Sequence, residues 1–312
     1  MNTPLYLVTG GCGFIGSHLV EALLRDGCRV RVLDNLSTGH RENLADVADA
    51  VDLRIGDITN PTDVSAACAG VDGVFHLAAL VSVADSVERP LENHRLNATG
   101  TLNVLLAARN AGARRVVFAS SAAIYGNAPG LPKREDQPPA PVSPYGAAKL
   151  MGEHYLKIFH RLYGLEAVSC RFFNVYGPRQ DPSSPYSGVI SRFVDALRAG
   201  AQPVLFGDGE QTRDFVFVAD VASALLGAMR RESSGDGSAY NVATGAATSL
   251  LQLLDGLGRV SGVAPAPRFE PARGGDVRHS LASIDAAQRA FGFTPAYSLA
   301  AGLAELWKGT TR

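Results

Sequence analysis

The sequence contains few of the residues that mark secreted, metal-binding or membrane-spanning proteins. Only four of its 312 residues are cysteines, and Cys12, Cys28, Cys68 and Cys170 lie far apart in apolar contexts. This spacing indicates neither a disulfide framework nor a zinc site, so we expect no metal and a reducing, cytoplasmic location. The N-terminal residues lack the basic and long apolar segments of a signal peptide. No apolar run approaches the roughly 20 residues that a membrane-spanning helix needs, so no membrane partner is expected.

An excess of charge of either sign is also missing. The chain has 29 Lys and Arg against 30 Asp and Glu, which gives a formal charge of −1. Because no basic face is visible, nucleic acid is not an expected partner. Apolar residues make up 46% of the chain, which is typical of a packed globular protein with one large or two modest domains.

The first half of the chain alternates strand-like and helix-like segments. Apolar runs at 5–10, 29–35 and 114–121 are separated by segments with helical spacing, such as 17–27 and 101–112. Strands that are apolar on both faces and alternate with helices indicate a parallel sheet covered on both sides. The predicted fold is α/β, with a doubly wound parallel sheet of the Rossmann type.

This alternation breaks down in the second half, where loops rich in Pro, Ser and Gly separate shorter helices. We expect residues 1–173 to form the sheet domain, with about 214–243 rejoining it. Residues 174–213 and 244–312 are expected to form a smaller C-terminal domain that binds the substrate. Residues 230–240 are predicted to be a surface loop.

A glycine-rich turn joins the first predicted strand to the first predicted helix. Gly10, Gly13 and Gly16 follow the spacing GxxGxxG, which allows a tight turn, a close approach to a pyrophosphate, and close packing of helix on strand. The helix N-terminus then faces the phosphates with its N–H groups. Asp34 ends the second strand, 21 residues after Gly13. An acid there accepts hydrogen bonds from the adenosine ribose, which predicts NAD rather than NADP; the alternative is a merely structural turn.

Further candidates lie where other predicted strands end, since ligands of open α/β sheets bind beyond the carboxyl ends of the strands. Asp57 is expected to reach the adenine amino group, and Ala78 and Ala79 are small enough for the cofactor to lie against backbone. His76 is expected to be a packed strand residue rather than a base.

Tyr145 and Lys149 lie four residues apart on one face of a helix for which Ser143 supplies the cap and Pro144 the first turn. A phenol ordinarily titrates too high to act as a base at neutral pH. We expect the ammonium and the positive nicotinamide ring to lower that pKa, so that Tyr145 exchanges a proton with a sugar hydroxyl while a hydride moves to or from NAD. Ser121, at the end of the preceding strand, would share the hydroxyl's hydrogen bond. An accidental pair on an amphipathic helix is the alternative.

These motifs together resemble a known family. "TGGCGFIGSHL", "DNLSTG", "GDI", "HLAA", "SSAAIYG" and "SPYGAAK" resemble the extended short-chain dehydrogenase/reductase family. "RFFNVYGPRQ", "RDFVFVAD" and "RGGDVRHS" narrow the resemblance to nucleotide-sugar 4-epimerases, the UDP-glucose/UDP-N-acetylglucosamine group. The resemblance covers nearly the whole chain and implies NAD as cofactor, a UDP-sugar as substrate, and a homodimer formed through residues 93–112 and the helix after Ser143.

The resemblance also implies roles for individual residues. The catalytic positions are Ser121, Tyr145 and Lys149. The positions that match NAD contacts are Gly10, Gly13, Phe14, Ile15, Asp34, Asn35, Ser37, Thr38, Gly39, Asp57, Ile58, Leu77, Ala78, Ala79, Asn97, Tyr145, Lys149 and Phe172. The positions that match contacts to the UDP-sugar are Ser121, Tyr145, Asn174, Val189, Arg213, Arg273, Asp276 and Ser280.

Three further features bear on the substrate. Arg213 and Arg273 carry the planar donor fork that suits a diphosphate. Val81 stands where some members of the family carry a lysine, which departs from their pattern. The resemblance places Ser280 at the pocket wall beside the sugar C2 substituent, where some members carry a tyrosine. Because serine is far smaller, we expect UDP-GlcNAc and UDP-GalNAc to be accepted, with or without UDP-Glc and UDP-Gal.

The expected chemistry is 4-epimerisation. The resembling dehydratases and decarboxylases place acid/base groups just after the strand-end Ser or Thr, where this chain has Ala122 and Ala123. The remaining reaction is therefore removal of a hydride at C4, rotation of the 4-keto sugar and return of the hydride. Two alternatives stay open: an NAD-dependent oxidoreductase or other epimerase on a related nucleotide sugar, such as UDP-glucuronate, and a non-catalytic nucleotide-sensing protein.

Overall fold

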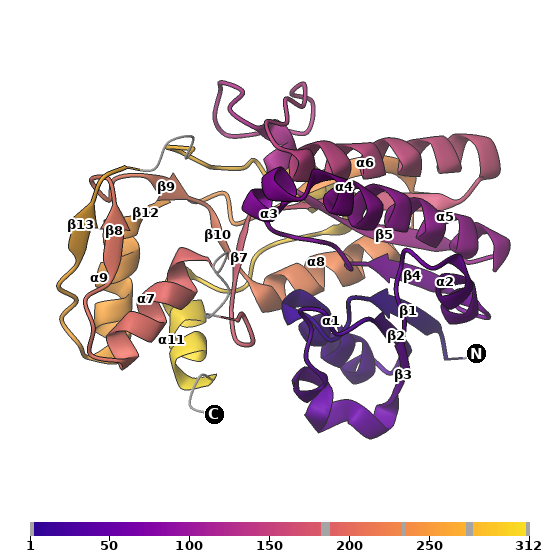
Figure 1. Cartoon of the computed structure of the whole chain (residues 1–312), viewed down its shortest axis with the longest axis horizontal. Coiled ribbons are helices and arrows are strands. Elements are labelled where there is room, and N and C mark those ends of the chain that lie inside the picture. The colour runs from indigo at the N-terminus through magenta and orange to yellow at the C-terminus, as the bar shows by residue number, and fades with distance from the viewer. Residues whose placement is uncertain (1–2, 182–187, 233–234, 273–276, 310–312) are drawn as a thin grey trace.

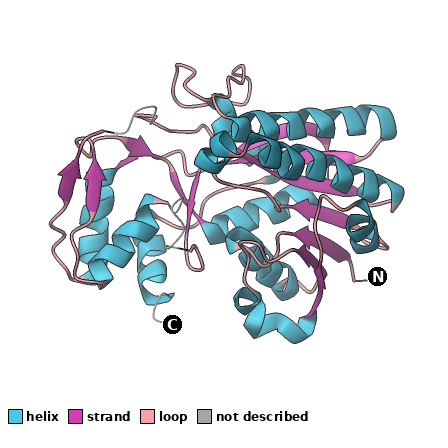
Figure 2. Ribbon diagram, in the orientation of Figure 1, coloured by secondary structure: helices cyan, strands magenta, loops and turns pink. Residues whose placement is uncertain are grey.

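A seven-stranded parallel sheet forms the centre of the chain in the computed structural model, which describes residues 3–181, 188–232, 235–272 and 277–309. The strand order is β11-β6-β5-β4-β1-β2-β3, and each neighbouring pair is parallel (Figures 1 and 2). The strands are β1 Leu5–Thr9, β2 Arg29–Asp34, β3 Val51–Ile55, β4 Gly73–His76, β5 Arg115–Ser121, β6 Glu166–Phe172 and β11 Asp236–Val242. The order runs outward in both directions from β1 and β4, so the predicted doubly wound α/β fold is confirmed.

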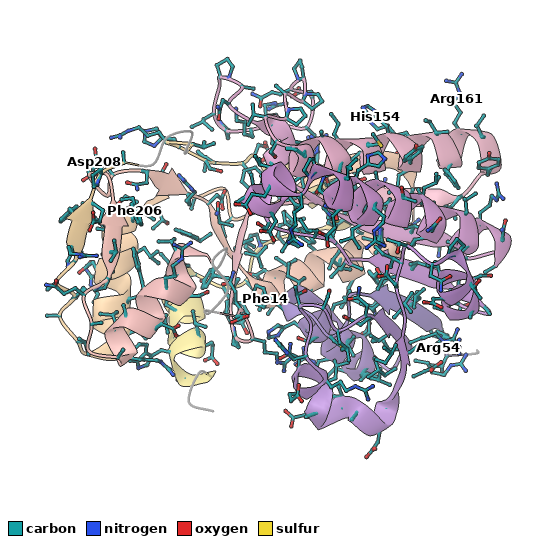
Figure 3. The ribbon with its side chains drawn as sticks, viewed as in Figure 1. Phe14, Arg54, His154, Arg161, Phe206 and Asp208 are labelled. Carbon is teal, nitrogen blue, oxygen red and sulfur yellow. The ribbon has the colours of Figure 1, made fainter. Side chains whose placement is uncertain are left out.

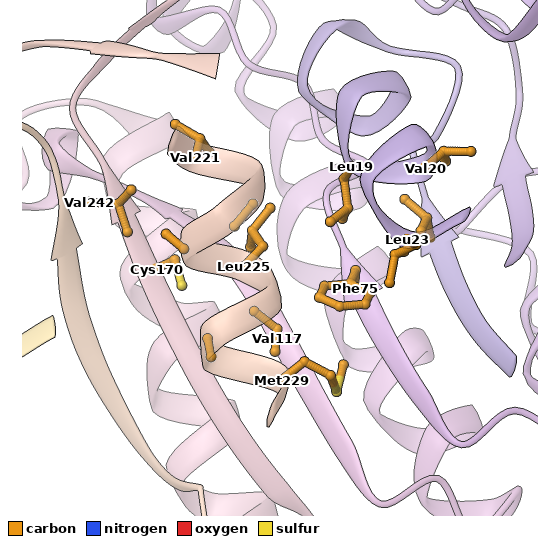
Figure 4. Packing of buried hydrophobic residues seen from close by; sticks show 14 of the residues in the cluster. Leu19, Val20, Leu23, Phe75, Val117, Cys170, Val221, Leu225, Met229 and Val242 are labelled. Atoms are coloured by element: carbon orange, nitrogen blue, oxygen red, sulfur yellow. The ribbon is translucent and has the colours of Figure 1, made fainter. Parts of the chain in front are cut away.

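Helices cover both faces of this sheet, as the apolar character of the strands requires. One core cluster joins the strands to α1 (Phe14–Arg25) and α8 (Val218–Arg230), with side chains such as Leu19 and Leu225 packed on Phe75 and Val117 (Figure 4). A second cluster lies on the opposite face. It joins the strands to α2 (Pro61–Cys68), α5 (Gly100–Asn110) and α6 (Pro144–Tyr163).

Short elements follow the carboxyl ends of β2, β4 and β5. They are η1 Arg41–Ala50, α3 Val83–Glu88, α4 Pro90–Asn93, η2 His94–Thr99 and η3 Ala122–Tyr125. η2 is a π-helical stretch that continues directly into α5. None of the helices in the described ranges is long and apolar enough to cross a membrane.

A smaller lobe lies beside the sheet and has a core of its own, which includes Phe193, Leu205, Leu253 and Leu303 (Figure 1, left). Three two-stranded sheets, β10–β7, β12–β9 and β13–β8, accompany its helices. The remaining elements are β7 Asn174–Tyr176, α7 Val189–Arg198, β8 Val204–Phe206, β9 Thr212–Arg213, β10 Phe215–Phe217, β12 Thr248–Ser249, α9 Leu250–Ser261, β13 Arg268–Glu270, α10 Asp285–Phe291 and α11 Leu299–Gly309. The domain boundaries that we expected, at residues 173 and 213 and near 243, remain our proposal.

Strand β11 corrects one expectation. Residues 236–240 were predicted to be part of a surface loop, yet they belong to β11, which pairs with β6 at the edge of the central sheet. The segment's Gly and Ser content gives no strand signal, and the register shifts between Asp236 and Ala239. The strand forms because it pairs with the free edge of β6. Local composition does not report such a long-range contact.

Candidate functional site

The glycine turn leaves backbone exposed at the N-terminus of α1. Gly10 adopts a φ of +73°, and Gly13 is the N-cap of α1 with no side-chain hydrogen bond of its own. A Cβ on Gly16 would lie 2.1 Å from the carbonyl oxygen of Gly10, and one on Gly10 would lie 2.8 Å from the amide nitrogen of Ala78. Only glycine allows these close approaches, which pack the first turn of α1 on the glycine turn and bring Gly10 against Leu77 and Ala78 after β4.

An acidic residue ends β2 and another follows β3, beside this turn. The carboxylate of Asp34 accepts hydrogen bonds from the N–H groups of Cys12 and Leu36, both at 2.9 Å. Asp57 accepts hydrogen bonds from Asn35 Nδ2 at 3.1 Å and from Thr59 N at 2.8 Å. Each carboxylate keeps further lone pairs, which suit the hydroxyl groups of a ribose or an amino group.

A buried histidine supports the floor of the same site. His76 Nδ1 lies 2.8 Å from Thr9 Oγ1, and its Nε2 lies 3.0 Å from Thr101 Oγ1. Thr9 Oγ1 also accepts hydrogen bonds from the N–H groups of Leu77 and Ala78, both at 3.2 Å. Burial, aided by the charge of Lys149, lowers the pKa of His76 to about 3. The neutral ring therefore holds backbone in place and is the packed strand residue that the sequence indicated.

The first turn of α6 carries Tyr145 and is capped by two serines. Ser143 Oγ accepts a hydrogen bond from the N–H of Gly146, and Ser86 Oγ, from α3, accepts one from the N–H of Tyr145 itself, both at 3.1 Å. Tyr145 is buried, and the Ser121 side chain lies near enough to its hydroxyl to lower the pKa of the phenol. Helix α6 thus brings Tyr145 to the end of β5, where Ser121 lies.

Lys149 lies one turn along α6 and is also buried. Its Nζ donates a hydrogen bond to the carbonyl oxygen of Ala119 at 2.8 Å and lies 5.8 Å from the centre of the Tyr145 ring. Ser121 pairs in register with Phe172 at the end of β6. The structure therefore brings all three predicted catalytic side chains and Phe172 to the carboxyl ends of β5 and β6.

The pKa of Tyr145 differs from the expectation. Burial raises it above the ordinary phenol value, and the hydrogen bond with Ser121 opposes this only in part. Burial also lowers the pKa of Lys149 to about 7. Because the amine is only partly charged near neutral pH, it does not lower the pKa of the phenol as predicted from spacing alone. The contribution of the nicotinamide ring stays a prediction.

A pocket of about 210 Å³ opens in the smaller lobe. Three predicted substrate residues, Asn174, Val189 and Arg213, lie in its wall. The other lining residues are Arg192, Phe193, Val204, Phe206, Gln211 and Leu250. Figure 3 labels Phe206 in this lobe and Phe14 at its junction with the sheet part. The sequence did not predict that Arg192, Phe193 and Phe206 lie in this wall. The Gly-rich stretch that precedes Arg213 was the one signal of a binding loop nearby.

Several predicted residues lie elsewhere. Ser280 is not in the wall of this pocket, but its N–H donates to the carbonyl oxygen of Thr212 at 3.1 Å, next to Arg213. Asn97 is buried, and its amide is bonded to both backbone polar groups of Leu80. Ile58 is buried in the core. Arg273 and Asp276 lie outside the described residues.

Three comparisons place the chain among known proteins. The model of the NAD dependent epimerase/dehydratase family matches residues 6–243. The UDP-glucose 4-epimerase of Mycolicibacterium smegmatis is 42% identical over 304 residues, which cover 96% of each chain.

Two solved structures are similar over almost the whole chain. A UDP-N-acetylglucosamine 4-epimerase from Methanobrevibacter ruminantium, in complex with UDP-N-acetylmuramic acid, has a TM-score of 0.94 and 38% identity, covering 99% of this chain and 98% of that one. A UDP-glucuronic acid 4-epimerase from Bacillus cereus, in complex with a fluorinated UDP-glucuronic acid and NAD, has a TM-score of 0.90 and 29% identity, covering 98% of each.

Proposed function

Because this chain belongs to the NAD dependent epimerase/dehydratase family, we propose that it is an isomerase that uses NAD to invert C4 of a UDP-sugar. The observation that carries this proposal is the meeting of Ser121, Tyr145 and Lys149 at the strand ends beside the glycine turn. The family match and the similarity to 4-epimerases over almost the whole chain support it.

The glycine turn fits a bound dinucleotide. Gly13, the N-cap of α1, has no side chain, so a pyrophosphate can approach the first N–H groups of the helix. Asp34 would hold the adenosine ribose, and the backbone after β4 would line the far side. NAD, held there, would supply the hydride acceptor and donor for C4 of the sugar.

The chain's own residues manage the proton. Tyr145 accepts the proton of the sugar 4-hydroxyl as the hydride leaves C4, and it gives the proton back when the hydride returns on the other face. Ser121, at the end of β5, would hold the substrate oxygen in line with Tyr145. Lys149, anchored on Ala119, lies beside the phenol ring and would hold the nicotinamide ribose. Ala122 and Ala123, which follow Ser121 at the start of η3, provide no acid or base for elimination.

The test is incubation of the purified protein with UDP-Glc, UDP-Gal, UDP-GlcNAc, UDP-GalNAc and UDP-glucuronate, each alone, with chromatographic separation of the products. Conversion of a sugar into its C4 epimer without net change in the reduced-nicotinamide absorbance supports an epimerase. Steady accumulation of reduced cofactor would instead identify an oxidoreductase, and absence of any product would favour nucleotide sensing.

The acetylated sugars are the expected substrates, since the resemblance places the small Ser280 beside the C2 substituent. In the structure Ser280 bonds Thr212, next to Arg213, and lies outside the wall of the 210 Å³ pocket. We predict that Ser280→Tyr lowers kcat/KM on UDP-GlcNAc and UDP-GalNAc about tenfold or more relative to UDP-Glc and UDP-Gal, because overpacking a pocket penalises the ligand that needs the space. Rates on the four sugars, measured for wild type and variant together, provide the test. Wild-type protein that ignores both acetylated sugars, or equal losses on both pairs, contradicts this assignment.

We also propose that the protein forms a homodimer in the cytoplasm. Helix α6 exposes Met151, Ile158, Leu162 and Tyr163, and Leu91 on α4 is 85% exposed. These apolar side chains do not pack on the chain's own sheet, and a second copy would cover them.

We predict that light scattering finds a dimer and that Leu162→Arg, which places a charge in the covered face, shifts it toward monomer. Val263 is an exposed valine in the smaller lobe, so Val263→Arg is the matched control and should leave the dimer intact. A monomeric wild type, or a Leu162→Arg protein that remains as dimeric as the control, would refute this interface.

A further inference from the structure

A buried polar cluster lies beneath the helix that carries Tyr145 and Lys149. The carboxylate of Glu153 on α6 accepts a hydrogen bond from Ser120 Oγ at 2.5 Å. It also accepts hydrogen bonds from Arg171 Nε at 2.9 Å and from Arg171 Nη2 at 2.7 Å. The Glu153 and Arg171 side chains are 2% and 5% exposed. Glu153 therefore binds two neighbouring strands from within the protein, out of reach of solvent.

The cluster extends to a third strand. Arg171 Nη1 donates to the hydroxyl of Tyr125 at 2.9 Å, and that hydroxyl donates to Asn241 Oδ1, on β11, at 2.7 Å. Tyr125 and Asn241 are buried as well. A connected network of satisfied groups in a low-dielectric interior holds its members in one arrangement, because breaking any bond leaves a buried polar group unpaired.

The position of this cluster relates it to the proposed catalytic residues. Ser120 directly precedes Ser121 on β5, and Arg171, its partner in register on β6, directly precedes Phe172. Glu153 lies one helical turn beyond Lys149 and two turns beyond Tyr145 on α6. The Ser120–Glu153 bond therefore ties the strand that carries Ser121 to the helix that carries Tyr145.

Two other contacts between α6 and β5 are weaker constraints on the helix. Lys149 donates to a backbone oxygen of Ala119, through a flexible side chain. Gly152 allows the helix to approach Phe118, since a Cβ there would lie 2.7 Å from the ring. That packing sets the helix-to-strand distance but does not prevent sliding along the strand. The Ser120–Glu153–Arg171 bonds are directional, and they set the register of helix against strand.

We propose that Ser120 and Glu153 are positioning residues, which hold Tyr145 at the correct place relative to Ser121. This inference rests on the proposed function of that pair. Glu153 contacts neither Tyr145 nor Ser121, so it acts through the position of α6. A small displacement of an acid/base group from its substrate lowers the rate strongly while the pocket that binds the nucleotide is unaffected.

The test compares two buried serines on adjacent central strands. Ser120→Ala removes the bond to Glu153 but leaves the Glu153–Arg171 pair intact, so no unpaired charge is created. Ser169→Ala is the matched control: Ser169, on β6, is equally buried, and its hydroxyl has no hydrogen-bond partner among the described residues. We expect Ser120→Ala to lower kcat about tenfold with KM for the UDP-sugar and NAD content changed less than twofold. The control should retain wild-type values.

A second measurement does not depend on turnover. Amide hydrogen exchange of residues 144–153, with NAD bound, is expected to be faster in Ser120→Ala than in wild type and unchanged in Ser169→Ala, because the released helix samples more positions. Equal exchange in all three proteins, or a Ser120→Ala enzyme with wild-type kcat, would overturn the positioning role. A wild type without epimerase activity would contradict the proposed function, and the exchange result would still decide whether Ser120 holds the helix.

Discussion

Replacement of Tyr145 by phenylalanine is expected to lower kcat by about 10²- to 10⁴-fold, the usual contribution of a general acid/base group. The ring remains to fill its buried position, and only the hydroxyl that exchanges the proton is lost. NAD content should therefore stay at the wild-type level. Turnover of the preferred UDP-sugar and the NAD released on denaturation are the two measurements.

Tyr163→Phe is the matched control for this prediction. Tyr163 lies at the end of the same helix, α6, and is 50% exposed. The same hydroxyl is removed far from the strand ends, so the control should keep full activity. A Tyr145→Phe protein that turns over as fast as the control would disprove the proposed mechanism.

Gly16→Ala is expected to abolish cofactor retention and, with it, activity. The added Cβ would lie 2.1 Å from the carbonyl oxygen of Gly10, so either α1 or the turn must move. We expect the wild type to retain bound NAD through purification, since the reaction regenerates it. The variant should lose nearly all of it and unfold at lower temperature, because forced overpacking costs about 1–3 kcal/mol or more. Assay of NAD in the denatured supernatant and thermal unfolding measure the two effects.

Gly256→Ala is the control for a glycine within a helix. Gly256 lies in α9, and its Cβ would meet only a side-chain carbon of Leu303 at 3.2 Å, which can shift. Alanine also favours the helix more than glycine does. This variant should keep its NAD. A Gly16→Ala protein with bound NAD and full turnover would show that the turn does not form the proposed phosphate site.

Local features of the sequence predicted strands β1 to β6 and the chemical groups at their ends. The first strand, the glycine turn and α1 follow from hydrophobic spacing and from backbone geometry that glycine alone allows. Tyr145 and Lys149 share a face because their spacing is one helical turn, and the cap at Ser143 followed by Pro144 marks where that helix begins. Each of these inferences depends on residues close together in the chain.

What the sequence determined by itself was therefore the set of elements and the chemical groups at their ends. The tertiary structure decided which distant segments meet. β11 joins the sheet because β6 has a free edge, and Phe206 and Arg192 reach the wall that contains Arg213 only through the packing of the smaller lobe. The pKa of Tyr145 is raised rather than lowered because it depends on burial. Desolvation and long-range pairing arise from the whole packed chain, and no local pattern encodes them.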